Sequence, residues 1–164
     1  MSTRFARFSG EKVVQLTPEQ GLCVSTFLLI RKGDALLLGK VIRPDIVKGK
    51  WVLPASQLLY GEHPDDSVRR ILKEQLNTEP EAVSYRGLWS FADRHWDLCF
   101  VYDVDVRGEP RPLSEAEGAK YPHEYWYCSQ LLAELKYVRP EEIRAEEIGR
   151  GHADVLQAVG ILKA

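Results

Sequence analysis

The chain has 164 residues, 45% hydrophobic and 28% charged, a balance that is typical of a globular domain and excludes disordered or collagen-like classes. Lys and Arg total 22 against 24 Asp and Glu, so the net charge of −2 offers no basic field for nucleic acid or an anionic membrane. The length predicts one domain over residues 1–164, and the absence of a signal core or of roughly 20 consecutive apolar residues predicts a cytoplasmic location.

The first predicted element is a β-hairpin over residues 21–41. Two apolar runs lie on either side of Gly33 and its neighbouring Asp, which suit a tight reversal. A loop over residues 42–50 follows, and it leads to a short strand over residues 51–54. We expect Pro54 to end this strand, because proline has no backbone N–H to donate.

Residues 63–77 have the spacing of a helix. Val68 and Leu72 belong to an apolar set that recurs every three or four positions. Pro64 suits the first helical turn, and Asn77 suits the left-handed position that ends many helices. The pattern therefore predicts a helix that ends at Asn77.

The second half of the chain mixes strand and helix patterns without regular alternation. In chain order it predicts strands over residues 83–90 and 98–106, an irregular loop over 108–118, a short strand over 124–128, a helical turn over 130–135, and helices over 140–163 with a break at 149–151. This order favours a mixed sheet packed between helices over a doubly wound parallel sheet.

Several common catalytic motifs are missing from the sequence. It contains no phosphate loop, no dinucleotide-binding glycine pattern, no His-Glu-x-x-His and no Gly-x-Ser-x-Gly. The histidines have no His partner at helical spacing, so surface or hydrogen-bonded core histidines are the simplest interpretation.

The densest chemical pattern lies between residues 49 and 77. A strand reading Trp-Val-Leu-Pro-Ala-Ser precedes Glu62, and Arg70 and Glu74 follow at spacings of eight and four. This arrangement resembles the Nudix hydrolase family, whose box reads G-x5-E-x7-REUxEExGU, with U a large apolar residue. The resemblance covers roughly residues 13–138 and implies an α+β fold, a Nudix-type α/β/α sandwich with a mixed sheet.

The box of this chain departs from the family pattern. Ser56 stands for its first Gly, Ile71 and Gln75 stand for two of its glutamates, and Asn77 stands for its last Gly. On a helix, positions 71, 74 and 75 share one face, where the family has three carboxylates and this chain has only Glu74. Hard ions such as Mg²⁺ need several anionic oxygens, so the metal site is predicted to be weak or absent.

The resemblance implies roles for the box residues that remain. Glu74, Glu62 and Arg70 are the predicted catalytic residues, and Glu74 and Glu62 are the predicted ligands of Mg²⁺ or Mn²⁺. An ion pair between Glu62 and Arg70 is expected to brace the loop against the helix whether the protein is a hydrolase or a binding module. The alternative role of Glu74 is that of an exposed ion-pair partner of Arg70, and Ile71 has a simple alternative role in packing. Family members often take a further glutamate from a later loop, where this chain has Glu115, Glu117 and Glu124.

The loop before the box is basic. Lys40, Arg43, Lys48 and Lys50 against Asp45 give residues 40–50 a charge of 4 − 1 = +3. Arg43, Lys48 and Lys50 are therefore predicted to bind the phosphates of a nucleotide-like ligand, although a solvated loop would show the same composition.

The function expected from this resemblance is weak or atypical hydrolysis of a nucleoside-diphosphate-linked small molecule. The alternative is a non-catalytic Nudix-like module that binds a nucleotide or a protein partner without turnover. A homodimer is possible because family members often dimerise, and neither a nucleic-acid nor a membrane partner is expected.

Overall fold

The computed structural model describes residues 5–8, 12–15, 21–92, 96–121 and 130–163. Strands β1 (Phe5–Phe8) and β2 (Lys12–Gln15) pair only with each other, antiparallel. The other described strands form one mixed sheet: β3 (Leu22–Lys32), β4 (Ala35–Arg43), β5 (Trp51–Val52), β6 (Ala55–Gln57), β7 (Pro80–Ala92), β8 (Trp96–Val106) and β9 (Leu131–Val138).

Strand β3 is the centre of this sheet. It pairs antiparallel with β4 and β6 and parallel with β8, and β8 continues to β7 at the edge. Its side chains alternate between two buried clusters, with Phe27 and Leu29 on one face and Leu28 and Ile30 on the other. Successive side chains of a strand point to opposite faces, so a strand that is covered on both faces needs a continuous apolar run such as this one.

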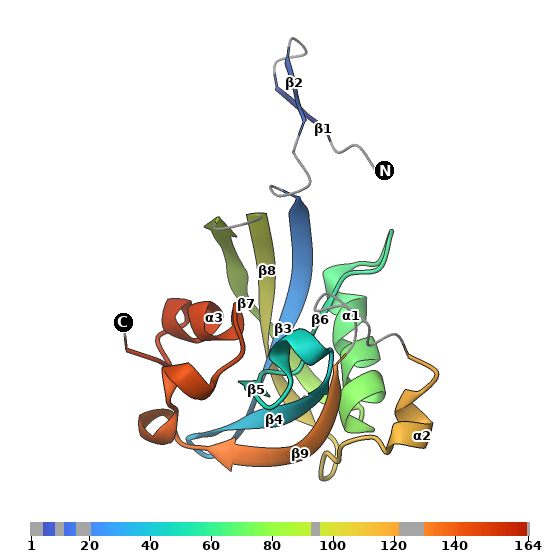
Figure 1. Cartoon of the computed structure of the whole chain (residues 1–164), viewed down its shortest axis with the longest axis vertical. Helices are drawn as coiled ribbons and strands as arrows, with labels where there is room; N and C mark the ends of the chain where they lie inside the picture. Colours follow the sequence, from blue (N-terminus) through green and yellow to red (C-terminus); the bar gives the residue numbers. More distant parts are fainter. Residues whose placement is uncertain (1–4, 9–11, 16–20, 93–95, 122–129, 164) are drawn as a thin grey trace.

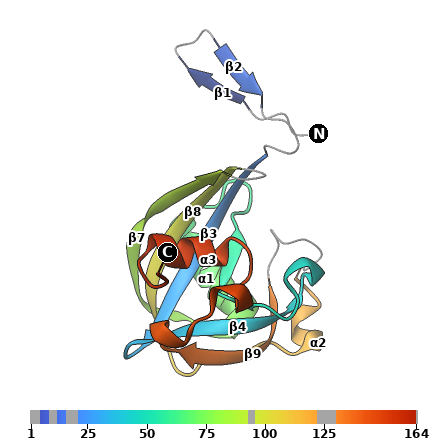
Figure 2. The same cartoon turned by 60° about the vertical axis from the view of Figure 1, so that its left-hand side comes forward.

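Helices cover the two faces. Helix α1 (Pro64–Ile71), which continues as a π-helix over Leu72–Leu76, packs on one cluster, and α3 (His152–Ala158) packs on the other. Figures 1 and 2 show α1 and α3 on opposite sides of the sheet. The predicted α/β/α sandwich with a mixed sheet is therefore confirmed. No helix in the described ranges is long and apolar enough to cross a bilayer.

The structure confirms the elements with the clearest patterns. The predicted hairpin is β3–β4, and Gly33 in its turn has a φ of 62°. The predicted helix ends at Asn77, which adopts the left-handed conformation with a φ of 46°. The strands predicted over residues 83–90 and 98–106 are the longer strands β7 and β8.

The helical turn predicted over residues 130–135 is wrong, because these residues begin strand β9. Leu131, Leu135 and Val138 recur at helical spacing, but β4 offers a free edge to which residues 131–138 pair antiparallel. Register shifts beside Val41 interrupt the alternation of this pair, which explains why the strand pattern was not visible in the sequence.

Other boundaries also differ from the prediction. The short strand predicted over residues 51–54 is β5, which ends at Val52, two residues before Pro54, and a separate strand, β6, begins at Ala55 and pairs with β3. The loop predicted over residues 108–118 contains helix α2 (Glu115–Gly118), and the helix predicted from Pro140 is two 3₁₀ turns, Pro140–Glu142 and Ala145–Glu147. The strand predicted over residues 124–128 lies outside the described residues.

Candidate functional site

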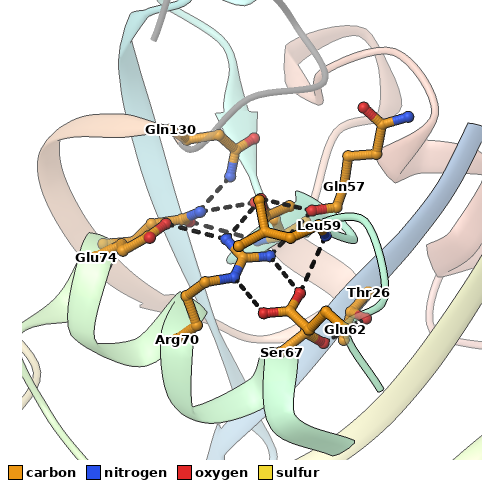
Figure 3. A network of polar contacts seen from close by, with 11 residues as sticks. Thr26, Gln57, Leu59, Glu62, Ser67, Arg70, Glu74 and Gln130 are labelled. Atoms are coloured by element: carbon orange, nitrogen blue, oxygen red, sulfur yellow. Dashed lines mark hydrogen bonds and ion pairs between the residues drawn. The ribbon is translucent and has the colours of Figure 1, made fainter. Parts of the chain in front are cut away.

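Arg70 is the centre of the polar network at the box (Figure 3). Its guanidinium forms a bidentate ion pair with Glu62, with Nε to Oε2 at 2.7 Å and Nη2 to Oε1 at 2.9 Å, and it donates to Glu74 at 3.1 Å. It also donates to Ser56 Oγ at 3.3 Å and to the backbone oxygen of Gln57 at 3.0 Å. The three predicted catalytic residues therefore lie in one contiguous network.

Glu62 is held by donors from two elements. Besides Arg70, the backbone N–H of Leu59 donates to its Oε1 at 3.2 Å. Burial acts to raise the pKa of Glu62, but the hydrogen bonds and positive charge of Arg70 and the Leu59 N–H outweigh it, so this pKa lies below its usual value. The Glu62 carboxylate is consequently ionised at neutral pH and braces the loop against α1, as the sequence predicted.

Gln75 occupies the position of the last box glutamate and is buried, and its amide is held by hydrogen bonds to the protein. Its Oε1 accepts from the Ala55 N–H at 3.4 Å and from Gln130 Nε2 at 3.2 Å, and its Nε2 donates to the Ala55 oxygen at 2.7 Å. Gln130 also donates to the backbone oxygen of Leu53 at 3.1 Å. We call Gln75, Gln130 and the Ala55 backbone the amide clasp.

The remaining box position is apolar. Ile71 is completely buried in the cluster that α1 forms with the sheet, which confirms its role in packing. In the described ranges no three His, Cys, Asp or Glu side chains are grouped as a metal site would require. Of the family's three carboxylate positions on this helix the chain keeps only Glu74, and Arg70 pairs with both Glu74 and Glu62, so these side chains do not form the three-carboxylate site of an intact box.

The possible replacement glutamates have other contacts or lie elsewhere. Glu117 accepts from Arg111 at 2.9 Å and caps α2 through the Ser114 backbone at 2.8 Å. The hydrogen bonds from Arg111 and Ser114 lower the pKa of Glu117 to about 2. Glu115 is exposed in the first turn of α2, and Glu124 lies outside the described residues.

Of the predicted phosphate-binding side chains, Arg43 is at the end of β4, and Lys48 and Lys50 lie on the loop between β4 and β5. Arg43 and Lys48 are exposed and have no ion pair with any residue that the structure describes. Lys50 donates to the backbone oxygen of Glu146 at 2.6 Å, so it is tied to the C-terminal segment. Arg43 and Lys48 are therefore the cations that remain available to a ligand.

Sequence reasoning missed Gln130 and left open whether His152 lies on the surface or in the core. Gln130 had no recognisable signal, since its partners are distant in sequence. His152 accepts from the backbone N–H of Leu53 at 3.1 Å, so it is one of the hydrogen-bonded core histidines that the sequence favoured. Burial lowers the pKa of His152 to about 3, and the ring is therefore neutral.

Comparisons with known proteins agree with this geometry. The family model described as NUDIX domain matches residues 20–159. A MutT NUDIX hydrolase from Burkholderia pseudomallei has a similar structure, with a TM-score of 0.65, 19% identity, and coverage of 85% of this chain and 99% of that chain. A MutT protein from Methanosarcina mazei gives a TM-score of 0.61 at 18% identity, covering 87% and 95%.

A third similar structure was solved with a ligand. It is the NUDIX domain of NrtR from Shewanella oneidensis in complex with ADP ribose, with a TM-score of 0.55 and 15% identity, covering 85% of this chain and 86% of that chain. At these identities the likeness of the structures concerns the fold, whereas the family model concerns the sequence over most of the chain.

Proposed function

Because the chain belongs to the NUDIX domain family, we propose that it binds a nucleoside-diphosphate-linked small molecule and hydrolyses the diphosphate only weakly. One observation carries the second half of this proposal. The network of Glu62, Arg70 and Glu74 is retained, while the other two carboxylate positions hold a core isoleucine and the glutamine of the amide clasp.

The ligand class is supported by charge and by a relative. Arg43 and Lys48 are exposed cations on the segment that precedes the box in sequence, and Lys50 extends the same basic segment. Such side chains bind phosphate oxygens through charge-assisted hydrogen bonds. ADP ribose, the ligand of the NrtR structure, contains a diphosphate that links two sugars.

The weak hydrolysis is assigned to Glu74 and Glu62. A divalent Mg²⁺ or Mn²⁺ ion bound by these carboxylates would neutralise phosphate charge and activate water. Arg70 neutralises both carboxylates at distances of 2.7 to 3.1 Å, so it competes directly with an ion for them. An ion at these carboxylates would therefore be held loosely, and turnover would be slow.

The test is to measure the nucleoside monophosphate formed from a panel of nucleoside-diphosphate-linked substrates with Mg²⁺, with Mn²⁺ and with EDTA. We expect slow, metal-dependent turnover that Glu74→Ala abolishes. Lys73→Ala is the matched control, because Lys73 is an exposed neighbour on the same helix. Fast turnover that survives Glu74→Ala would contradict the proposal and move the catalytic centre away from the box.

The amide clasp favours a second candidate, a module that binds the same ligand without turnover. Gln75 has all three of its described hydrogen bonds within the protein, so its amide oxygen is directed to protein donors and not to an ion. Calorimetry detects binding for both candidates, and the turnover assay distinguishes them, because the module binds a nucleoside diphosphate yet hydrolyses none of the substrates with either metal. Absence of binding would contradict both.

A further inference from the structure

The turn between β6 and α1 presents two large apolar side chains to solvent. Tyr60 is fully exposed and Leu59 is more than half exposed. This turn projects beyond the end of α1 (Figure 1). A tyrosine at such a position combines a large rigid contact surface with a low entropic cost of ordering, which is why tyrosines are common where proteins contact ligands.

The turn is held firmly although its tip is exposed. The Glu62 N–H donates to the Leu59 oxygen at 3.0 Å, and the Leu59 N–H donates back to the Glu62 carboxylate. Arg70 holds the preceding Gln57 oxygen at 3.0 Å. Gly61, with a φ of 78°, permits the reversal. Tyr60 is consequently presented on a backbone whose conformation is already fixed before any ligand binds.

The hydrogen bonds that hold this turn also connect it to the proposed ligand site. Arg70 contacts Glu62 and Glu74 at the same time as it holds the turn, and Figure 3 shows Leu59 directly beside Glu62 and Arg70. Tyr60 is therefore two residues from a carboxylate of the box. In a nucleoside diphosphate the base lies one ribose away from the phosphates, so the base of a ligand whose phosphates bind at the box is within reach of this turn.

We propose that Tyr60 is a specificity-determining residue that stacks on the base of the bound nucleoside diphosphate. This inference rests on the proposed function and adds to it that the base, and not only the diphosphate, contributes to affinity. Stacking on an aromatic ring accepts any base, because every base has a π-face. The turn thus selects for nucleosides over other diphosphates without selecting among the bases.

Calorimetric titration of the full chain with ADP and with inorganic diphosphate tests this inference. Replacing Tyr60→Ala is expected to weaken ADP binding about tenfold, which is within the usual range for one base–aromatic stack. It should leave the affinity for inorganic diphosphate unchanged. Tyr60→Phe should retain the wild-type affinity for ADP, and Tyr85→Ala, at another exposed tyrosine on β7, should change neither.

A spectroscopic readout complements the affinities. In Tyr60→Trp, ADP should quench the indole fluorescence, whereas inorganic diphosphate should not. Wild-type protein that binds ADP, together with a Tyr60→Ala variant of equal affinity, would overturn the inference and leave the proposed function intact. Wild-type protein that binds neither ligand would overturn both.

Discussion

Replacing Gln75 by glutamate restores one family carboxylate, and the amide clasp predicts that the restoration fails. In the wild type, Gln75 Nε2 donates to the Ala55 oxygen at 2.7 Å. An ionised carboxylate has no proton to donate, so the substitution Gln75→Glu places an acceptor against an acceptor in a buried site. Only a protonated carboxyl preserves this hydrogen bond, and the folded state therefore raises the pKa of the new group.

The magnitude follows from the cost of keeping that carboxyl protonated at pH 7. A glutamate titrates at about 4.3 when unfolded, so protonation at pH 7 costs about 3 to 4 kcal/mol, at roughly 1.4 kcal/mol per pH unit. The unfolded state has lost its proton at this pH, whereas the folded state retains it. The free energy of unfolding of Gln75→Glu should therefore fall below that of wild type as pH rises above about 4.3, and the two should converge as pH falls to that value.

Urea denaturation at pH 4.5 and pH 7 measures this difference. Gln157→Glu is the matched control, since it makes the same chemical change at an exposed position on α3 and should stay near wild type at both values. Gln75→Leu removes the hydrogen bonds without adding a titrating group, so its loss should not depend on pH. A Gln75→Glu variant that is as stable as wild type at pH 7 and is further stabilised by Mg²⁺ would refute this prediction. Its carboxylate would then bind a metal ion and would not face the Ala55 oxygen.

Two further predictions follow from other contacts. The folded-state pKa of His152 is about 3 against 6.5 for the free side chain, so the unfolded state binds the proton first as pH falls. The wild type should therefore lose about 2 kcal/mol of stability between pH 7 and pH 5 relative to His152→Gln. Urea midpoints that change equally with pH in the two proteins would contradict this. Replacing Arg43 and Lys48 together by alanine should weaken nucleoside-diphosphate binding severalfold, with less effect at high salt, because each supplies an exposed positive charge. Unchanged calorimetric affinity in moderate salt would place the phosphates elsewhere.

The sequence predicted elements whose signals are local. The apolar runs around Gly33 and the spacing that ends at Asn77 depend on neighbouring residues, and the structure confirms both. The spacing of Glu62 and Arg70 likewise predicted their ion pair. Strand β9 was missed because its conformation depends on the edge of β4, which lies about 90 residues earlier in the chain.

The sequence predicted the charged residues of the candidate site but did not predict the contact between its buried amides, Gln75 and Gln130. Ile71 could be assigned to packing because it extends an apolar arc on α1. The position of Gln75 between Ile71 and Leu76, on a largely buried helix face, is a signal that a buried partner exists. The identity of that partner, Gln130, depends on tertiary structure, since 55 residues separate the two amides.

The parallel pairing of β3 with β8 has a consequence for how the protein is made. Leu22 is opposite Trp96, so 96 − 22 = 74 residues separate the paired positions. At ribosomal rates of about 5–20 residues per second, β3 is synthesised ~4–15 s before its parallel partner. During this interval one edge of β3, the central strand of the sheet, is unpaired, and such edges associate readily with other chains. Slower synthesis of residues 33–95 should therefore lower the soluble yield of the newly made protein.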